Sequence, residues 1–143
     1  MSTAIVWFRR DLRLADNPAL SAALAAHDRV VPVYIHAPDE ESPWEPGAAS
    51  RWWLHHSLAA LADDLARRGT ALHLARGDSL AVLQSLAHTT GADAVYWNRL
   101  YEPAVIARDK RVKHVLREQG TAAHSFNAAM FVEPWEIETG QGG

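Results

Sequence analysis

The chain has 143 residues, of which 48% are hydrophobic and 22% are charged, and its formal net charge is −3. A chain of this length forms one domain that buries about 70% of its unfolded surface. It contains no cysteine, which excludes disulfide bonds, thiolate metal sites and cysteine nucleophiles. No apolar run reaches the roughly 18 residues of a membrane span, and the sequence opens without a cleavable signal pattern, so we expect a cytoplasmic protein with no membrane partner.

The first predicted strand is the short apolar run AIVWF at residues 4–8. The charged sequence RRD at 9–11 follows it, and a buried strand of this kind would deliver those groups to the edge of a sheet. A helix comes next, because Asn17 is a good N-cap and Pro18 suits the first helical position. We expect this helix to extend to about residue 27.

A second strand is predicted at 30–35, and it leads into an acidic loop with several prolines at 36–47. The following helix, at 50–68, carries one stripe of leucines at spacings of four, three and four, and the glycine at 69 ends it. This periodicity predicts that the stripe is buried. Its members are Leu54, Leu58, Leu61 and Leu65.

Three further strands and two further helices are predicted, in the order 71–75, 78–91, 94–97, 103–120 and 122–126. Both helices have an apolar stripe that we expect to face the core. The two stripes consist of Leu80, Leu83 and Leu86, and of Val105, Val112 and Leu116.

Strand and helix patterns alternate throughout, which is typical of a parallel sheet with helices on both faces. Five strands joined by four right-handed crossovers predict a doubly wound, Rossmann-like α/β fold. Residue patterns alone leave the strand order open. In such sheets ligands bind beyond the carboxyl ends of the strands, where the direction of the crossovers switches.

Charged, amide and aromatic side chains gather where the predicted strands end and where the helix at 50–68 begins. The amino terminus of that helix also carries partial positive charge. Together these groups would frame an aromatic-walled cleft suited to a flat, anionic small molecule. The candidate ligand-binding residues are Arg9, Arg10, Asp11, His36, Asp39, Arg51, Trp52, Asn98 and Glu102.

Structural interpretations fit some of the same residues. Arg9 or Arg13 could form an ion pair with Asp11 or Glu102 instead of contacting a ligand. Trp52 could simply pack in the core, where we also expect the aromatic residues of the strand at 94–97 to lie.

Familiar catalytic patterns are missing, since the chain has no phosphate-binding loop, no GxGxxG, no GxSxG and no HExxH. His55 and His56 are adjacent on a helix and point about 100° apart, so we predict no metal site there. A basic stretch on the helix at 103–120 is interrupted by acids, and we interpret it as a solvated outer face that does not hold DNA by itself. Its cations are Arg108, Lys110, Arg111, Lys113, His114 and Arg117.

Three segments resemble the DNA photolyase and cryptochrome family at matching spacing. They are WFRRDLRLADN at 7–17, PGAASRWWLHHSLAAL at 46–61, and AVYWNRLYEP followed by ARD at 94–109. The resemblance implies that residues 1–127 are the amino-terminal α/β domain of that family, with the strand order 3-2-1-4-5. It also implies that residues 128–143 begin a linker to a helical, FAD-binding domain that this chain does not contain.

In that family, light-excited reduced FAD splits pyrimidine dimers in DNA, and the α/β domain holds a second pigment that passes its energy to FAD. The resemblance therefore implies the antenna domain of a deoxyribodipyrimidine photolyase, a carbon–carbon lyase. Its implied partner is its own carboxyl-terminal FAD-binding domain, and damaged DNA would be bound through that domain. No catalytic residue of the repair reaction is expected in this chain.

One departure from the family pattern concerns the antenna pigment. Folate-binding members resembling this region carry an Asn-Glu pair where this chain has Ala104 and Val105. These side chains cannot form hydrogen bonds with a pterin, so the resemblance favours a deazaflavin or another flavin over a folate. Two further functions stay open: the same domain of a cryptochrome photoreceptor, and a free-standing nucleotide- or flavin-binding module.

Overall fold

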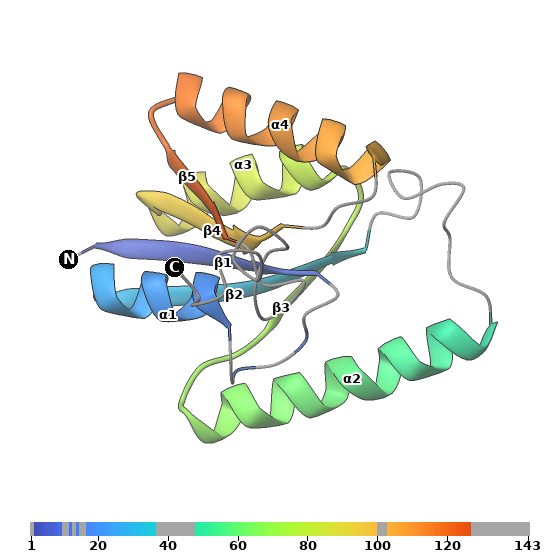
Figure 1. Ribbon diagram of the computed structural model, residues 1–143. Helices are drawn as coiled ribbons and strands as arrows, with labels where there is room; N and C mark the ends of the chain where they lie inside the picture. The colour runs from blue at the N-terminus through green and yellow to red at the C-terminus, as the bar shows by residue number, and fades with distance from the viewer. Residues whose placement is uncertain are drawn as a thin grey trace, which may run out of the picture.

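The computed structural model describes residues 2–9, 12, 14, 17–36, 48–99 and 103–126. Within these ranges the chain forms a five-stranded sheet with helices on both faces (Figure 1). Strands and helices alternate strictly along the chain, so the predicted α/β class is confirmed. None of the helices in these ranges combines the length and the apolar character needed to cross a membrane.

The strands are all parallel, and their order across the sheet is β3-β2-β1-β4-β5. This confirms the 3-2-1-4-5 order that the family resemblance implies. The central strand β1 is buried along its whole length, because β2 and β4 flank it and helices cover both of its faces. The strands span Thr3–Phe8 (β1), Arg29–His36 (β2), His73–Arg76 (β3), Ala94–Asn98 (β4) and Ala122–Phe126 (β5).

The described helices begin and end within about two residues of their predicted positions. Asn17 caps α1 and Asp78 caps α3, each by accepting a hydrogen bond from a backbone N–H three residues further on. Gly91 ends α3 in the left-handed conformation, with φ of 70°. The helices span Pro18–Ala26 (α1), Ala48–Arg67 (α2), Ser79–Thr90 (α3) and Pro103–Glu118 (α4).

The edge strand β3 differs from its prediction by starting two residues later, at His73. It pairs only with the second half of β2, from Val33 opposite His73 to His36 opposite Arg76. The preceding Leu72 instead packs against the core. An edge strand is limited by the one neighbour that it pairs with, and hydropathy does not reveal that limit.

The core has two layers, one on each face of the sheet. Ile5 and Trp7 of β1 point to the face covered by α3 and α4, whereas Val6 and Phe8 point to the face covered by α1 and α2 (Figure 1). This alternation is the two-residue period of a strand whose faces are both buried.

The predicted helix stripes point toward these layers. In α2, Leu61 and Leu65 are buried, whereas Leu54 and Leu58 nearer its amino terminus are half-buried. The other stripe residues are fully buried except for the half-buried Leu86 of α3. The buried members are Leu80, Leu83, Val105, Val112 and Leu116.

Candidate functional site at the carboxyl edge of the sheet

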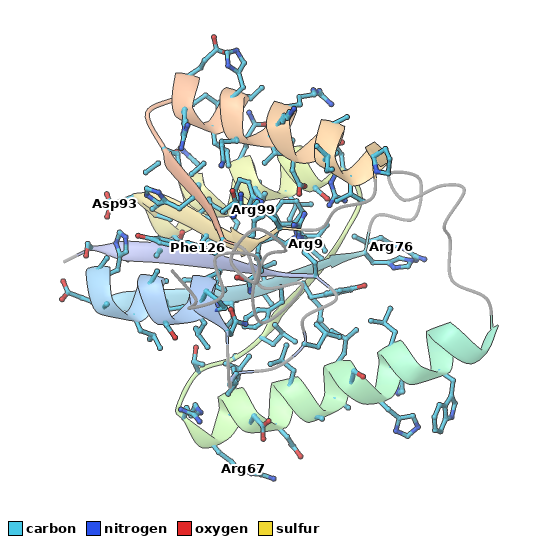
Figure 2. The ribbon with its side chains drawn as sticks, viewed as in Figure 1. Arg9, Arg67, Arg76, Asp93, Arg99 and Phe126 are labelled. Atoms are coloured by element: carbon cyan, nitrogen blue, oxygen red, sulfur yellow. The ribbon has the colours of Figure 1, made fainter. Side chains whose placement is uncertain are left out.

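The crossovers change direction at β1, which places the carboxyl ends of β2, β1 and β4 side by side. Arg9 directly follows β1, His36 ends β2, and Asn98 ends β4. Figure 2 shows Arg9 and Arg76 at this end of the sheet. The structure thus brings the predicted strand-end residues to one edge, the position where open parallel sheets bind ligands.

Arg9 is paired with Asp109 of α4. Its Nη1 donates to both carboxylate oxygens, at 2.6 and 2.7 Å, and its Nη2 donates to the backbone carbonyl of Asn98. The side chains of Arg9 and Asp109 are only 4% and 11% exposed, so this is a buried ion pair in which each charge offsets part of the desolvation cost of the other. Arg9 therefore forms an ion pair with Asp109, a partner that was not considered from the sequence; Asp11 and Glu102, the partners considered there, lie outside the described residues.

The sequence contains a signal for the burial of Asp109, which no short motif marks. Asp109 lies on the same stripe as Val105, Val112 and Leu116, at spacings of four, three and four. An acidic residue on a buried apolar stripe needs a partner of opposite charge, because an isolated buried carboxylate is costly. That argument would have predicted a buried cation opposite α4.

Two guanidinium groups flank the ring of Trp7 beside this pair. The Cζ atoms of Arg9 and Arg108 lie 4.7 and 5.0 Å from the ring centroid, and Arg108 also contacts Asp109, with Nη2 3.3 Å from Oδ1. Trp97 packs against Trp7 with a centroid distance of 5.4 Å and an angle of 67°. Cation–π contacts of this kind stabilise positive charge at the end of the sheet.

Asn98 joins the end of β4 to the start of α1. Its Oδ1 accepts from the backbone N–H of Ala19 at 3.0 Å, and its Nδ2 donates to Oδ1 of Asn17 at 2.7 Å. Asn17 in turn accepts from the N–H of Leu20 as the helix cap. Arg9 and Asn98 therefore meet as predicted, and the bonds described for both side chains are to the protein itself.

His36 and Trp52 lie at the same end of the fold as Arg9. His36 is half-buried, and its carbonyl accepts from the N–H of Gly77 after β3. Trp52 is near the amino terminus of α2, which points toward the carboxyl edge (Figure 1). It is 63% exposed, with its ring centroid 4.1 Å from that of His56 and the rings inclined by 52°. The core-packing interpretation of Trp52 is therefore wrong, since most of its ring faces solvent.

The remaining candidates are not placed. Arg51 lies in α2, but its side chain is outside the described part, and the other four are outside it altogether. Within the described ranges, no group of three His, Cys, Asp or Glu side chains could hold a metal ion. The four candidates outside the described residues are Arg10, Asp11, Asp39 and Glu102.

Comparison with known proteins connects this architecture to a family. The family model described as DNA photolyase matches residues 4–143. The chain belongs to the DNA photolyase family. The resemblance of the three sequence segments is thereby confirmed, and the photolyase fold accounts for the order of the sheet.

Photolyases and cryptochromes are both among the similar proteins. Cryptochrome-1 of Arabidopsis thaliana is 49% identical over 135 residues, which cover 94% of this chain and 20% of that protein. The crystal structure of a bacterial class III photolyase from Agrobacterium tumefaciens is 46% identical, with a TM-score of 0.86, over 99% of this chain and 29% of that one.

An archaeal member of the photolyase family, from Sulfolobus tokodaii, is 32% identical with a TM-score of 0.79, over 87% of this chain and 29% of that one. Its crystal structure holds two FAD molecules, with the implication of a novel light-harvesting cofactor. The chain therefore spans 20–29% of the length of these relatives. It corresponds to the amino-terminal α/β domain of the photolyase and cryptochrome family.

Proposed function

We propose that this chain is the antenna domain of a photolyase, which holds a second chromophore and passes excitation energy to FAD in a helical domain. The observation that carries the proposal is the switch point at β1, because ligands of open parallel sheets bind there. The second FAD of the archaeal photolyase supports a chromophore in addition to the catalytic flavin. The lyase reaction and the binding of damaged DNA would belong to the helical domain.

The candidate residues would have different roles in holding the pigment. Trp52 offers an exposed aromatic face on which a flat ring system could stack, and His36 offers an imidazole at the end of β2. Arg9 and Asn98 would position the site by fixing the ends of β1 and β4, since both are bound to protein groups. The proposed contacts are completed by Arg10, Asp11, Asp39, Arg51 and Glu102.

We favour a deazaflavin or another flavin as the pigment. When bound, the pigment would absorb light and donate excitation energy, while the chain's own residues hold and orient its ring. Val105 is 1% exposed, so its side chain is not available to a ligand. This supports the argument from Ala104 and Val105 against a folate.

Absorption and fluorescence titrations of the chain with FAD, a 5-deazaflavin and a reduced folate would test the proposal. We expect a flavin or deazaflavin to bind saturably, and Trp52→Ala to weaken binding about tenfold through loss of stacking. Leu24→Ala is the matched control, because Leu24 is also a large exposed apolar residue but lies near the carboxyl end of α1. Saturable binding of the folate alone would contradict the choice of pigment. Binding of all three ligands without any effect of Trp52→Ala would contradict the site.

A cryptochrome photoreceptor is the second candidate, favoured by the 49% identity to Arabidopsis cryptochrome-1. The two candidates differ in DNA repair. A protein in which this chain precedes the FAD-binding domain should remove pyrimidine dimers in light and not in the dark if it is a photolyase. Equal dimer content after both treatments would favour the photoreceptor.

A further inference from the structure

The second half of α4 carries a group of cations away from the carboxyl edge. These residues line a shallow hollow of about 450 Å³ that is open to solvent. Helix α4 begins at the carboxyl edge and runs toward the opposite end of the sheet, so the hollow is separate from the switch point (Figure 1). The lining residues are Lys110, Lys113, His114, Arg117 and Glu118.

Two of these cations are held in place by β5. Nζ of Lys113 donates to Oγ of Ser125 at 2.7 Å and lies 5.8 Å from the ring centroid of Trp97. Nη2 of Arg117 donates to the carbonyl of Ala123 at 2.8 Å. Side chains that are already fixed lose little conformational freedom when a ligand binds.

The cations of the hollow have few counter-charges. Within the described residues, Lys110, Lys113 and Arg117 form no ion pair with a carboxylate, and Glu118 lies 3.3 Å from His114. Burial lowers the pKa of Lys113, and the charge of Arg117 lowers it further. Repulsion between Lys113, which is half-buried, and the exposed Arg117 disfavours the charge on Lys113, and an anion in the hollow would relieve it.

The helix dipole explains only part of this arrangement. Cations are favoured in the last turn of a helix, which accounts for Arg117. Lys110 and Lys113 lie further from the helix end, where this effect has faded. The spacing of Lys110, Lys113 and Arg117 instead places all three on one face of the helix.

We propose that Lys110, Lys113 and Arg117 bind the phosphate groups of a small molecule with two or more phosphates, such as a nucleoside diphosphate. The restriction of these cations to one face of α4 and the chain's net charge of −3 favour such a ligand over a DNA backbone, which needs an extended basic surface. This site is independent of the proposed pigment site.

Calorimetric titration and thermal denaturation of the chain test the proposal, with ADP and pyrophosphate as probes. We expect both to bind saturably and to raise the Tm, whereas adenosine and NaCl at matched ionic strength should do neither. Lys113→Met and Lys110→Gln should each weaken binding about tenfold, because each removes a charge-assisted contact. Arg67→Gln is the matched control, since Arg67 is an exposed cation in the last turn of α2.

Two results would overturn the proposal: no saturable binding of ADP or pyrophosphate, or equal binding by the wild type and Lys110→Gln. Lys110 is exposed, so its replacement tests the site even if Lys113→Met impairs folding. A short DNA duplex that binds with steep salt dependence while ADP does not bind would assign this surface to nucleic acid instead.

Discussion

Asp109 is the residue on which the carboxyl edge depends most. It compensates Arg9 and Arg108, and both of those guanidinium groups lie against Trp7. Buried ion pairs add little net stability, but the loss of one partner is costly because the other charge stays buried without its counter-charge in the pair. The consequence of a substitution therefore depends on whether one partner or both are removed.

We expect Asp109→Asn to lower the free energy of unfolding by about 3–5 kcal/mol, because Arg9 would keep its buried charge. The double variant Arg9→Met, Asp109→Leu should show a clearly smaller decrease in the free energy of unfolding. Urea denaturation of the three proteins measures the difference. Asp64→Asn removes the exposed partner of Arg67 and, as a control, should change stability by less than about 0.5 kcal/mol. Equal losses for the single and double variants would contradict this account.

The pKa of His124 in β5 responds to the positive charges on the neighbouring helix α4. Burial lowers its pKa below the ordinary value of 6.5, and the charges of Arg117 and Lys113 lower it further. As the pH falls through about 6.5, the unfolded chain takes up this proton before the folded chain does. The contribution of His124 to stability is therefore present above that pH and is lost as the pH falls through the lowered pKa.

We expect Lys113→Met to raise the pKa of His124 toward its ordinary value, because one repelling charge is removed. An NMR titration of the His124 imidazole measures this change directly. Arg67→Gln on α2 should leave the titration unchanged. A pKa that stays the same in Lys113→Met would show that the charge of Lys113 does not contribute to the shift.

At the scale of elements, the caps that define the helices also join them to the sheet. Asn17 caps α1 and accepts a hydrogen bond from Asn98 at the end of β4, whereas Asp78 is an exposed cap of α3. A cap that also anchors a strand should contribute more to the free energy of unfolding than a cap exposed to water.

Asp78→Ala should therefore destabilise the chain by about 1 kcal/mol and Asn17→Ala by about 2 kcal/mol or more. Thermal and urea denaturation measure both values. A loss for Asn17→Ala no greater than that for Asp78→Ala would mean that the contact with Asn98 adds nothing.

The elements were predictable from sequence because their signals are local. The caps at Asn17 and Asp78 and the leucine spacing in α2 each lie within a few turns of chain. The ion pair between Arg9 and Asp109 joins residues 100 positions apart, and the order of the strands decides which distant groups meet. The location of the site at the carboxyl edge of the sheet was therefore predictable from the sequence. The contacts among its residues were predictable only in part.

At the scale of the whole molecule, the two proposed sites use different parts of the fold. The pigment site lies at the carboxyl ends of β2, β1 and β4, and the phosphate site lies along the second half of α4. No cation of the hollow belongs to the candidate residues of the pigment site.

We therefore expect the affinity for ADP to change by less than about twofold when a flavin pigment is bound, because distant sites without shared contacts are nearly additive. Titration of ADP into the chain with and without saturating pigment measures this. Competition between the two ligands would show that one of the sites is misplaced.

The pairing of Arg9 with Asp109 also has a consequence for biosynthesis. The first strand leaves the ribosome early, whereas its counter-charge on α4 is translated 100 residues later. Until then Arg9, at the end of a strand that becomes buried along its whole length, lacks the carboxylate of Asp109. The carboxyl edge can thus reach its final arrangement only after α4 has been translated.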